Sequence, residues 1–289
     1  MKQYREVALI GTGMIGGSLA LALREAGVAA RFVGYDAEPG VAERARARGI
    51  LDAVAADPGA AAATADLILL AVPVRATLAV CEALAPVLAQ RSDVLVSDAG
   101  STKVDVLAAV ERTLPWPERF VGAHPIAGTE RSGPEAANAA LFSGKRCLLT
   151  PTARTRPDSL AACRALWEAA GAIVSELEAT AHDQALAYVS HLPHAAAFAL
   201  AAAVGHEPAA VGLSGGGFVD TTRIAASDPA MWRDVFLANA GPILGALELL
   251  DQELGSLRRA IALGDGAAIE RWIARAREGR RRVLAGPAR

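Results

Sequence analysis

The residue best suited to proton chemistry is His124, in the run 121-VGAHPIAGTE-130. A free imidazole has a pKa of ~6.5, so a neutral ring accepts a proton from a hydroxyl at neutral pH. A glycine-rich pattern lies upstream of His124, and a second histidine cluster, 190-SHLPH-194, lies downstream. We expect His124 to act as a base on a substrate hydroxyl while a nicotinamide accepts the hydride. The alternative is a turn residue, because a histidine beside a proline in a glycine-containing loop is often structural.

The glycine pattern upstream has the form and the context of a dinucleotide-binding loop. Gly11, Gly13 and Gly16 follow a short apolar run at 7–10 and precede a helical pattern. Glycines there permit a tight turn, a close approach of backbone to a pyrophosphate, and close packing of helix on strand. The N–H groups at the helix start then favour the phosphate charge. We predict a Rossmann-type cofactor site that includes Gly11, Gly13, Met14, Ile15 and Gly16.

Asp36 ends the next predicted strand, 31–36, and indicates which dinucleotide binds. Its carboxylate can accept hydrogen bonds from the adenosine ribose hydroxyls and would repel a 2′-phosphate, which favours NAD over NADP. Arg44, Arg46 and Arg48 keep NADP as an alternative. A solvated helix face is the simpler interpretation of these arginines.

Predicted strands alternate with helices over roughly the first 175 residues. Besides 7–10 and 31–36, strand signals fall at 66–74, 120–123, 146–151 and 172–177, and the stretch 93–103 is a strand that runs into a polar loop. This alternation predicts an α/β fold with a mostly parallel, doubly wound sheet, which places ligands at the carboxyl ends of its strands. Val72 and Pro73 come at one such end and are expected to border the nicotinamide. Ser101 follows another, where its hydroxyl caps the next helix, contacts a ligand, or does both.

The strand signal stops near residue 178, and helical patterns continue to the end of the chain. A long helix is expected over 179–204 with a kink or break near Pro193. We therefore divide the chain into a nucleotide-binding Rossmann domain, 1–178, and an all-α C-terminal domain, 179–289. This Ala-rich helical domain would be thin alone, which predicts a homodimer formed by packing against a copy of itself.

The composition argues against several other classes of protein. A net charge of −2 with balanced acidic and basic residues gives no field for nucleic acid, and the arginines after residue 270 suit a solvated helix face. Three scattered cysteines suggest neither a metal site nor a disulfide framework. We see no signal peptide, and the longest apolar run, 195–205, falls short of the ~18–20 residues of a membrane span. We expect a cytoplasmic protein that binds no metal, membrane or nucleic acid.

Five motifs together resemble those of the prephenate dehydrogenases, including the arogenate and cyclohexadienyl dehydrogenases of tyrosine biosynthesis. They are GTGMIGGS at 11–18, SDAGSTK at 97–103, HPIAGTE at 124–130, HDQALAYVSHLPHA at 182–195 and TTRIAASDPAMWRD at 221–234. The resemblance covers nearly the whole chain. It implies NAD-dependent oxidative decarboxylation of prephenate to 4-hydroxyphenylpyruvate, or of arogenate to tyrosine.

The resemblance also implies roles for single residues. His124 matches the catalytic histidine, and Ser101 matches a position that bonds to the same hydroxyl or holds the histidine. Arg223 matches the arginine that pairs with a substrate carboxylate, which its planar guanidinium can do bidentately. The implied substrate-binding residues are Thr129, Ser190, His194 and Arg223, of which Ser190 and His194 share a helix face at i, i+4 spacing.

Other polar residues in these motifs have structural interpretations. We expect His182 and Asp183 to form a helix-start pair rather than part of the site, and His191 to be a core or capping residue as readily as a ligand contact. Met231 and Trp232 are expected to be packing residues. For Arg223 the alternative is a structural ion pair.

Two rival functions stay open at this stage. One is another Rossmann enzyme with a helical domain, such as a 3-hydroxyacid dehydrogenase or an imine reductase. Such enzymes typically use a lysine or another polar centre in the helical part, and this chain has no lysine after Lys145. The other is a non-catalytic dinucleotide sensor, which needs the glycine loop but not His124, Ser101 and Arg223 together.

Overall fold

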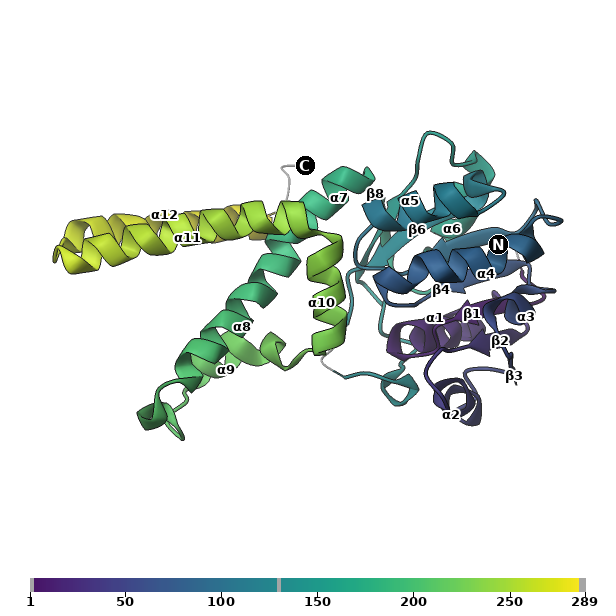
Figure 1. Cartoon of the computed structure of the whole chain (residues 1–289), viewed down its shortest axis with the longest axis horizontal. Helices are drawn as coiled ribbons and strands as arrows, with labels where there is room; N and C mark the ends of the chain where they lie inside the picture. The colour runs from purple at the N-terminus through teal and green to yellow at the C-terminus, as the bar shows by residue number, and fades with distance from the viewer. Residues whose placement is uncertain (1–2, 129–130, 286–289) are drawn as a thin grey trace. The chain divides into compact units, whose positions relative to one another are not determined.

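The computed structural model describes residues 3–128 and 131–285 of the 289-residue chain. The chain divides into two compact units, Met1–Ala240 and Gly241–Arg289, which we call unit 1 and unit 2. Unit 1 contains the whole sheet and the first helices after it (Figure 1). The boundary expected near 178 follows the last strand, whereas the compact unit continues through these helices to Ala240.

Within the described residues, unit 1 is built on an eight-stranded sheet in the order β3-β2-β1-β4-β5-β6-β7-β8. Its strands are β1 (Val7–Ile10), β2 (Phe32–Tyr35), β3 (Ala53–Val54), β4 (Leu67–Leu70), β5 (Leu95–Asp98), β6 (Phe120–Pro125), β7 (Arg146–Thr150) and β8 (Ile173–Glu176). Neighbouring strands pair in parallel except β6 and β7, which are antiparallel with His124 opposite Leu148. The predicted mostly parallel α/β sheet is confirmed.

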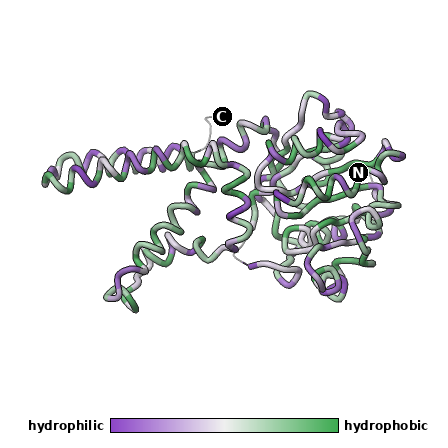
Figure 2. The backbone as a smooth tube through the Cα atoms, in the orientation of Figure 1, coloured by the Kyte–Doolittle hydropathy of each residue, from purple (hydrophilic) through white to green (hydrophobic). Residues whose placement is uncertain are grey.

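Helices cover both faces of this sheet, because successive strand residues point to opposite sides. One face packs against α1 (Met14–Glu25), α2 (Val41–Ala47) and α6 (Pro157–Ala169). The other packs against α3 (Pro58–Ala62), α4 (Thr77–Leu88) and α5 (Val104–Thr113). The central strands β1 and β4 are therefore apolar and buried along their whole length rather than alternating (Figure 2).

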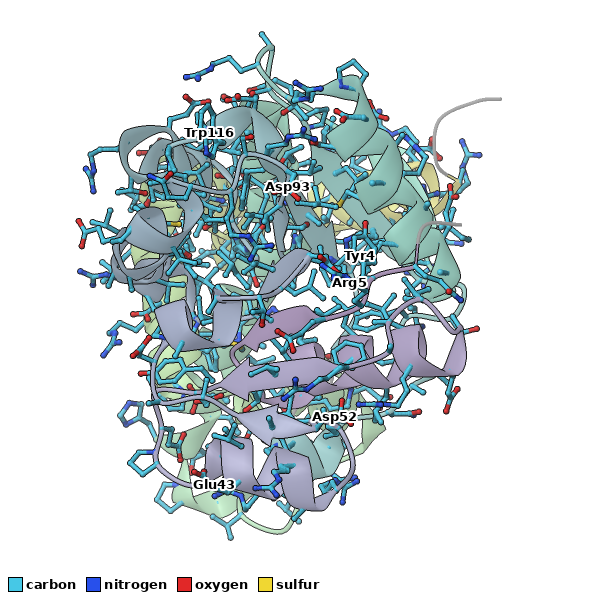
Figure 3. The ribbon with its side chains drawn as sticks, turned by 90° about the vertical axis from the view of Figure 1, so that its right-hand side faces the viewer. Tyr4, Arg5, Glu43, Asp52, Asp93 and Trp116 are labelled. Carbon is cyan, nitrogen blue, oxygen red and sulfur yellow. The ribbon has the colours of Figure 1, made fainter. Side chains whose placement is uncertain are left out.

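Ion pairs connect the segments that precede the strands, at the amino ends of the sheet. Arg5, just before β1, bonds to Asp66 before β4 through its guanidinium at 3.0 Å and its backbone N–H at 3.0 Å. Asp52, before β3, pairs with Arg24 of α1 at 2.8 Å. Figure 3 labels Arg5 and Asp52 at this edge. These pairs hold the sheet together at the edge away from the candidate site, which lies at the carboxyl ends.

The helix expected after residue 179 is interrupted close to Pro193. α7 (Ala179–Leu186) passes into a π-helical segment, η4 (Ala187–His191), and then into α8 (Leu192–Gly205). Pro193 lies in the first turn of α8 and has no N–H to donate, so the regular hydrogen-bond ladder fails just before it. α9 (Gly216–Thr222), η6 (Arg223–Ala226) and α10 (Pro229–Ala238) complete unit 1.

Unit 2 consists of most of α11 (Ala240–Ala262) together with α12 (Gly266–Ala285). The two helices are tied by Glu253, which accepts from the Trp272 indole at 2.7 Å and pairs with Arg275 at 3.7 Å. Large apolar side chains are nevertheless exposed along both helices, among them Leu244, Leu249, Leu254, Ile261, Ile273 and Val283.

By length and composition alone, the helical stretch Ala179–Gly205 could cross a membrane, since it has 27 residues and a mean hydropathy of 1.3. The apolar run of 195–205 expected from the sequence therefore underestimates the length of this apolar helical stretch. A core or subunit-contact helix passes the same test, and three polar residues of this stretch, His182, Asp183 and His191, are buried inside unit 1.

Candidate active site

Two adjoining cavities lie where β1, β4, β5 and β6 end. The larger has a volume of about 590 Å³ and the smaller about 370 Å³. Their common wall consists of Met14, Ile15, Ala99, Ser101, Ser227 and Met231. Two ligands bound side by side would therefore meet at Ser101, in the loop after β5.

The larger cavity brings together most of the residues predicted to bind the cofactor. Its wall includes Gly13, Met14, Ile15, Val72 and Pro73. Among the described lining residues, Gly11, Gly16 and Asp36 do not occur. These three residues instead shape or flank the loop that forms the wall.

The glycines after β1 meet different steric demands. Gly11 has a φ of +90°, and a Cβ there would lie 2.3 Å from the Ala71 carbonyl oxygen. A Cβ at Gly16 would lie 2.2 Å from the carbonyl oxygen of Gly11, so α1 can pack on the turn only without a side chain. At Gly13 a Cβ would meet nothing within 4 Å. The predicted turn and packing roles agree with this geometry, and the open space at Gly13 leaves room for a phosphate group.

Asp36 is held firmly at the end of β2. One carboxylate oxygen accepts from the Thr12 N–H at 2.7 Å and the Thr12 hydroxyl at 3.2 Å, and the other accepts from the Glu38 N–H at 3.1 Å. Arg44, which kept NADP open, pairs with Glu135 at 3.0 Å. A carboxylate thus neutralises part of the positive charge that a 2′-phosphate would require.

The smaller cavity brings together the residues predicted to handle the substrate. Its wall contains His124, Ser101, Ser190, His194 and Arg223. Thr129 lies outside the described residues. The same wall includes Met231 and Trp232, which the sequence suggested only for packing. Trp232 is buried and its indole N–H has no hydrogen-bond partner in the described part of the chain.

A buried ion pair fixes the backbone that carries His124. Lys103 and Asp98 form this pair, with side chains 0% and 4% exposed. The Lys103 ammonium also donates to the Ala123 carbonyl at 2.7 Å, and Asp98 accepts from the Ala123 N–H at 2.9 Å. The backbone N–H and carbonyl of Ala123, the residue before His124, are therefore both hydrogen-bonded to this pair.

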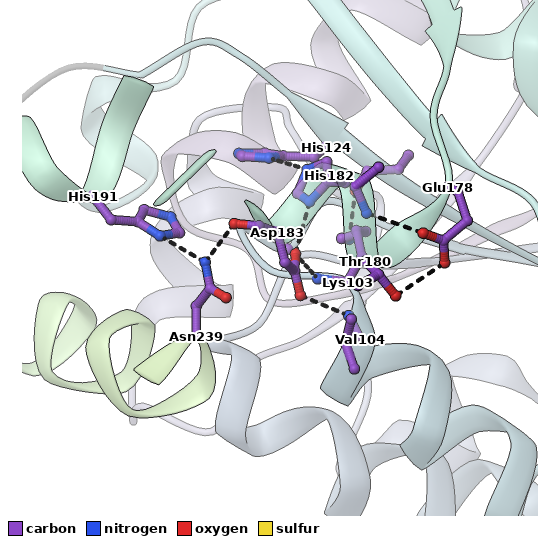
Figure 4. A network of polar contacts seen from close by, with 12 residues as sticks. Lys103, Val104, His124, Glu178, Thr180, His182, Asp183, His191 and Asn239 are labelled. Atoms are coloured by element: carbon purple, nitrogen blue, oxygen red, sulfur yellow. Dashed lines mark hydrogen bonds and ion pairs between the residues drawn. The ribbon is translucent and has the colours of Figure 1, made fainter. Parts of the chain in front are cut away.

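The His124 ring is joined to two residues that the sequence suggested were structural. His124 Nδ1 lies 2.9 Å from His182 Nε2, and His182 Nδ1 lies 2.7 Å from an Asp183 carboxylate oxygen. Asp183 also accepts from the backbone N–H groups of Lys103 at 2.8 Å and Val104 at 2.9 Å. It thereby caps α5 from a different helix (Figure 4).

The pKa shifts in this network follow from burial and charge. Burial of its ring holds the pKa of His124 well below its usual range, and the neighbouring His182, Lys103 and His191 lower it further. For Asp183, burial raises the pKa, but hydrogen bonds from His182, Val104 and Lys103 outweigh this and leave it lowered. At neutral pH the site therefore contains a neutral His124 and an ionised Asp183.

The two other histidines of the helical segment are also held in place. His194 Nδ1 lies 2.8 Å from the Ser190 carbonyl, and its ring stacks on Trp232 with centroids 3.7 Å apart. A carbonyl only accepts, so Nδ1 carries the hydrogen and neutral His194 has Nε2 as an acceptor. His191 accepts from the Asn239 amide at 3.1 Å, and burial lowers its pKa to about 4.

This arrangement suits the oxidation of an alcohol. A neutral imidazole can take a hydroxyl proton in a cavity that adjoins a second, nucleotide-sized cavity. Arg223 adds a cation for a carboxylate in the same wall. Within the part of the chain that the structure describes, no group of three or more His, Cys, Asp or Glu side chains could hold a metal ion.

Comparisons with known proteins match this chain to one family along nearly its whole length. Residues 19–176 match the family model described as the nucleotide-binding domain of prephenate dehydrogenase, and residues 178–275 match the one described as its dimerization domain. The cyclohexadienyl dehydrogenase of Zymomonas mobilis is 40% identical over 92% of both chains.

Solved structures give the same result. The prephenate dehydrogenase from A. aeolicus, in complex with hydroxyphenyl propionate and NAD+, has a TM-score of 0.87 and 36% identity, covering 96% of this chain and 97% of that one. Synechocystis arogenate dehydrogenase has a TM-score of 0.78 and 29% identity, covering 95% and 98%. By its two family-model matches and its identity to these relatives, the chain belongs to the prephenate dehydrogenase family.

Proposed function

We propose that this protein catalyses the NAD-dependent oxidative decarboxylation of prephenate to 4-hydroxyphenylpyruvate in tyrosine biosynthesis. The observation that carries the proposal is the junction of two cavities at Ser101, with a neutral His124 lining the smaller one. The names of the relatives support the same reaction. A non-catalytic sensor would not need this constellation.

The residues around the larger cavity suit a dinucleotide. A pyrophosphate would lie at the start of α1, where the helix dipole favours negative charge and the open space at Gly13 lets that group approach. Asp36 would bind the ribose hydroxyls, and Val72 and Pro73 would border the nicotinamide ring. When bound, NAD supplies the hydride acceptor.

His124 and Ser101 would carry the proton chemistry. His124 accepts the proton of the ring hydroxyl as hydride leaves the carbinol carbon, and Ser101 bonds to the same hydroxyl or to the histidine. Loss of CO₂ then restores aromaticity, so the substrate supplies most of the driving force. The walls have to hold two carboxylates away from water, which requires cations and hydrogen-bond donors.

Arg223, Ser190 and His194 would bind the rest of the substrate, together with Thr129. Arg223 pairs with a carboxylate. Arogenate, which has an amine in place of the side-chain ketone, is the second candidate substrate. It stays a candidate because its ammonium group could donate to the acceptor nitrogen of neutral His194.

We further propose a cytoplasmic homodimer in which residues 1–178 bind the nucleotide and residues 179–289 form the dimer contact. The exposed apolar side chains of α11 and α12 support this, since a second copy of the chain would cover them. The dimerization domain of the matching family model spans residues 178–275.

The test is to mix purified protein with prephenate or arogenate, each with NAD⁺ or NADP⁺, and to follow the absorbance of the reduced cofactor. We expect turnover of prephenate with NAD⁺ and much weaker turnover with NADP⁺. Absence of NADH with both substrates would refute the proposed function.

A further inference from the structure

The proposed role of His124 as a base depends on which of its two ring nitrogens carries the hydrogen. Neutral imidazole has one N–H and one lone pair, and only the lone pair accepts a proton. His124 Nδ1 is occupied by His182, so a base acting on a ligand in the cavity has to use Nε2. For that, the hydrogen has to be on Nδ1.

The positions of the ring hydrogens on His182 and His124 follow from Asp183, the residue at the end of this hydrogen-bond chain. The ionised Asp183 carboxylate can only accept, and it already takes two backbone N–H groups at the start of α5. His182 Nδ1, 2.7 Å away, must therefore be a donor. In a neutral ring this makes His182 Nε2 an acceptor, so His124 Nδ1 is the donor across their 2.9 Å contact.

From this geometry we propose that His182, oriented by Asp183, is a positioning residue that keeps His124 in its Nδ1–H tautomer with Nε2 free for the substrate hydroxyl. The inference deepens the proposed function and rests on it. The residues come from β6 and α7, and their alignment is seen in Figure 4.

The proton balance of the step is simple. The substrate O–H bond breaks and an N–H bond forms at His124 Nε2, while Nδ1 keeps its hydrogen and its bond to His182. His124 becomes an imidazolium, and the negative charge of Asp183 beyond His182 partly compensates it. No proton passes to Asp183, which keeps its three donors.

The opposite assignment requires a second hydrogen on His182. His182 would then be a cation with no exposed surface. A buried cation is costly without its own counter-charge, and Asp183 alone would have to supply it. His124 would then carry its hydrogen on Nε2 and could not accept the substrate proton there.

Two substitutions at one position separate the contact with His124 from the contact with Asp183. In His182→Asn, the short amide can still donate to Asp183, as Nδ1 does, but it does not reach His124. In His182→Gln, the longer amide places its oxygen near the position of Nε2, where it can accept from His124. A positioning role predicts a loss for Asn and rescue by Gln, whereas a purely structural role predicts the reverse.

The experiment measures kcat and KM with prephenate and NAD⁺, and the melting temperature, for both variants. We expect His182→Asn to lower kcat by about 100-fold, the lower end of what general-base catalysis contributes, with little change in either KM. His182→Gln should stay within about 5-fold of the wild type. His206→Gln, on an exposed residue, is the matched control and should change nothing.

A second measurement does not depend on turnover. Nitrogen NMR of the imidazole rings reports the tautomer of each of the five histidines, and the variants assign the signals. We expect hydrogen on Nδ1 of His124 in the wild type. Hydrogen on Nε2, or a folded His182→Asn variant with near-normal kcat, would overturn the inference. An inactive wild type with the expected tautomer would instead refute only the proposed function.

Discussion

At the scale of single residues, His124 has the neighbours that a base needs. Burial and the nearby Lys103 ammonium keep it neutral, Lys103 and Asp98 fix its backbone, and His182 bonds to its Nδ1. The sequence predicted His124 from its motif and its place after a strand. It assigned His182 a structural role, because two rings 58 positions apart meet only once α7 lies against β6.

Replacing the base tests its role directly. We expect His124→Asn to retain NAD binding and to lose turnover by more than about 100-fold, since the amide cannot accept the hydroxyl proton. Steady-state kinetics and NAD titration would measure the two effects. Near-normal turnover would remove His124 from this role.

The lowered pKa of His124 sets the pH dependence of activity. The neutral form is the active one, and its pKa lies below the ordinary value, so protonation begins only at a more acidic pH. We expect kcat to stay level as pH falls from 8 through ~6.5, the pKa of a free imidazole, and to decline only below it. A pH–rate profile that already falls between 8 and ~6.5 would contradict this.

Buried His191 makes folding stability depend on pH. Its pKa is about 4 in the folded chain and ~6.5 when unfolded, so the unfolded chain binds the proton first. The stabilisation is complete above pH ~6.5 and is lost as pH falls toward 4, by up to about 1.4 kcal/mol per pH unit. The free energy of unfolding, measured by chemical unfolding across this pH range, should fall less steeply with decreasing pH for His191→Gln than for the wild type. An unchanged dependence on pH would argue against the effect.

At the scale of elements, three segments converge at the start of α5. Asp183 of α7 caps that helix, and Lys103 at the same helix start bonds to β6. The sequence correctly predicted β5, β6, α5 and the break near Pro193, because their signals are local. The two-residue β3 was not predicted, and β7 was predicted as a strand at 146–151 without its antiparallel direction, since pairing partners and strand direction depend on the assembled sheet.

The buried pair at this junction should matter for stability. We expect Lys103→Met to lower the free energy of unfolding by about 3–5 kcal/mol, because it leaves the Asp98 carboxylate buried without its partner. Urea unfolding would measure the loss. Arg5→Met, at an exposed pair, is the control and should give a much smaller change. Equal effects would mean that burial of the pair does not matter.

At the scale of the whole molecule, the motifs predicted the fold class and the family, because they occur in the right order on alternating strands and helices. The adjoining cavities could not be predicted in detail, since their common wall takes residues from three stretches that are far apart in the sequence. The exposed apolar side chains of α11 and α12 would be covered in the proposed dimer.

The proposed dimer gives a test at this scale. We expect the wild type to sediment as a dimer, and Leu244→Arg with Ile261→Arg to shift it toward monomer, because both side chains are about 60% exposed and apolar. Activity should fall with dissociation, since the helical region 179–289 also contributes to the substrate cavity. Glu43→Arg, at an exposed position of α2, is the control. A monomeric wild type would contradict the assembly.

The central claim is that one reaction at one site couples oxidation to decarboxylation. The most direct measurement follows NADH and CO₂ together during turnover of prephenate with NAD⁺. We expect one CO₂ released for each NADH formed, with 4-hydroxyphenylpyruvate as the product, and neither CO₂ nor NADH with His124→Asn. NADH without CO₂, or no NADH from the wild type, would contradict it.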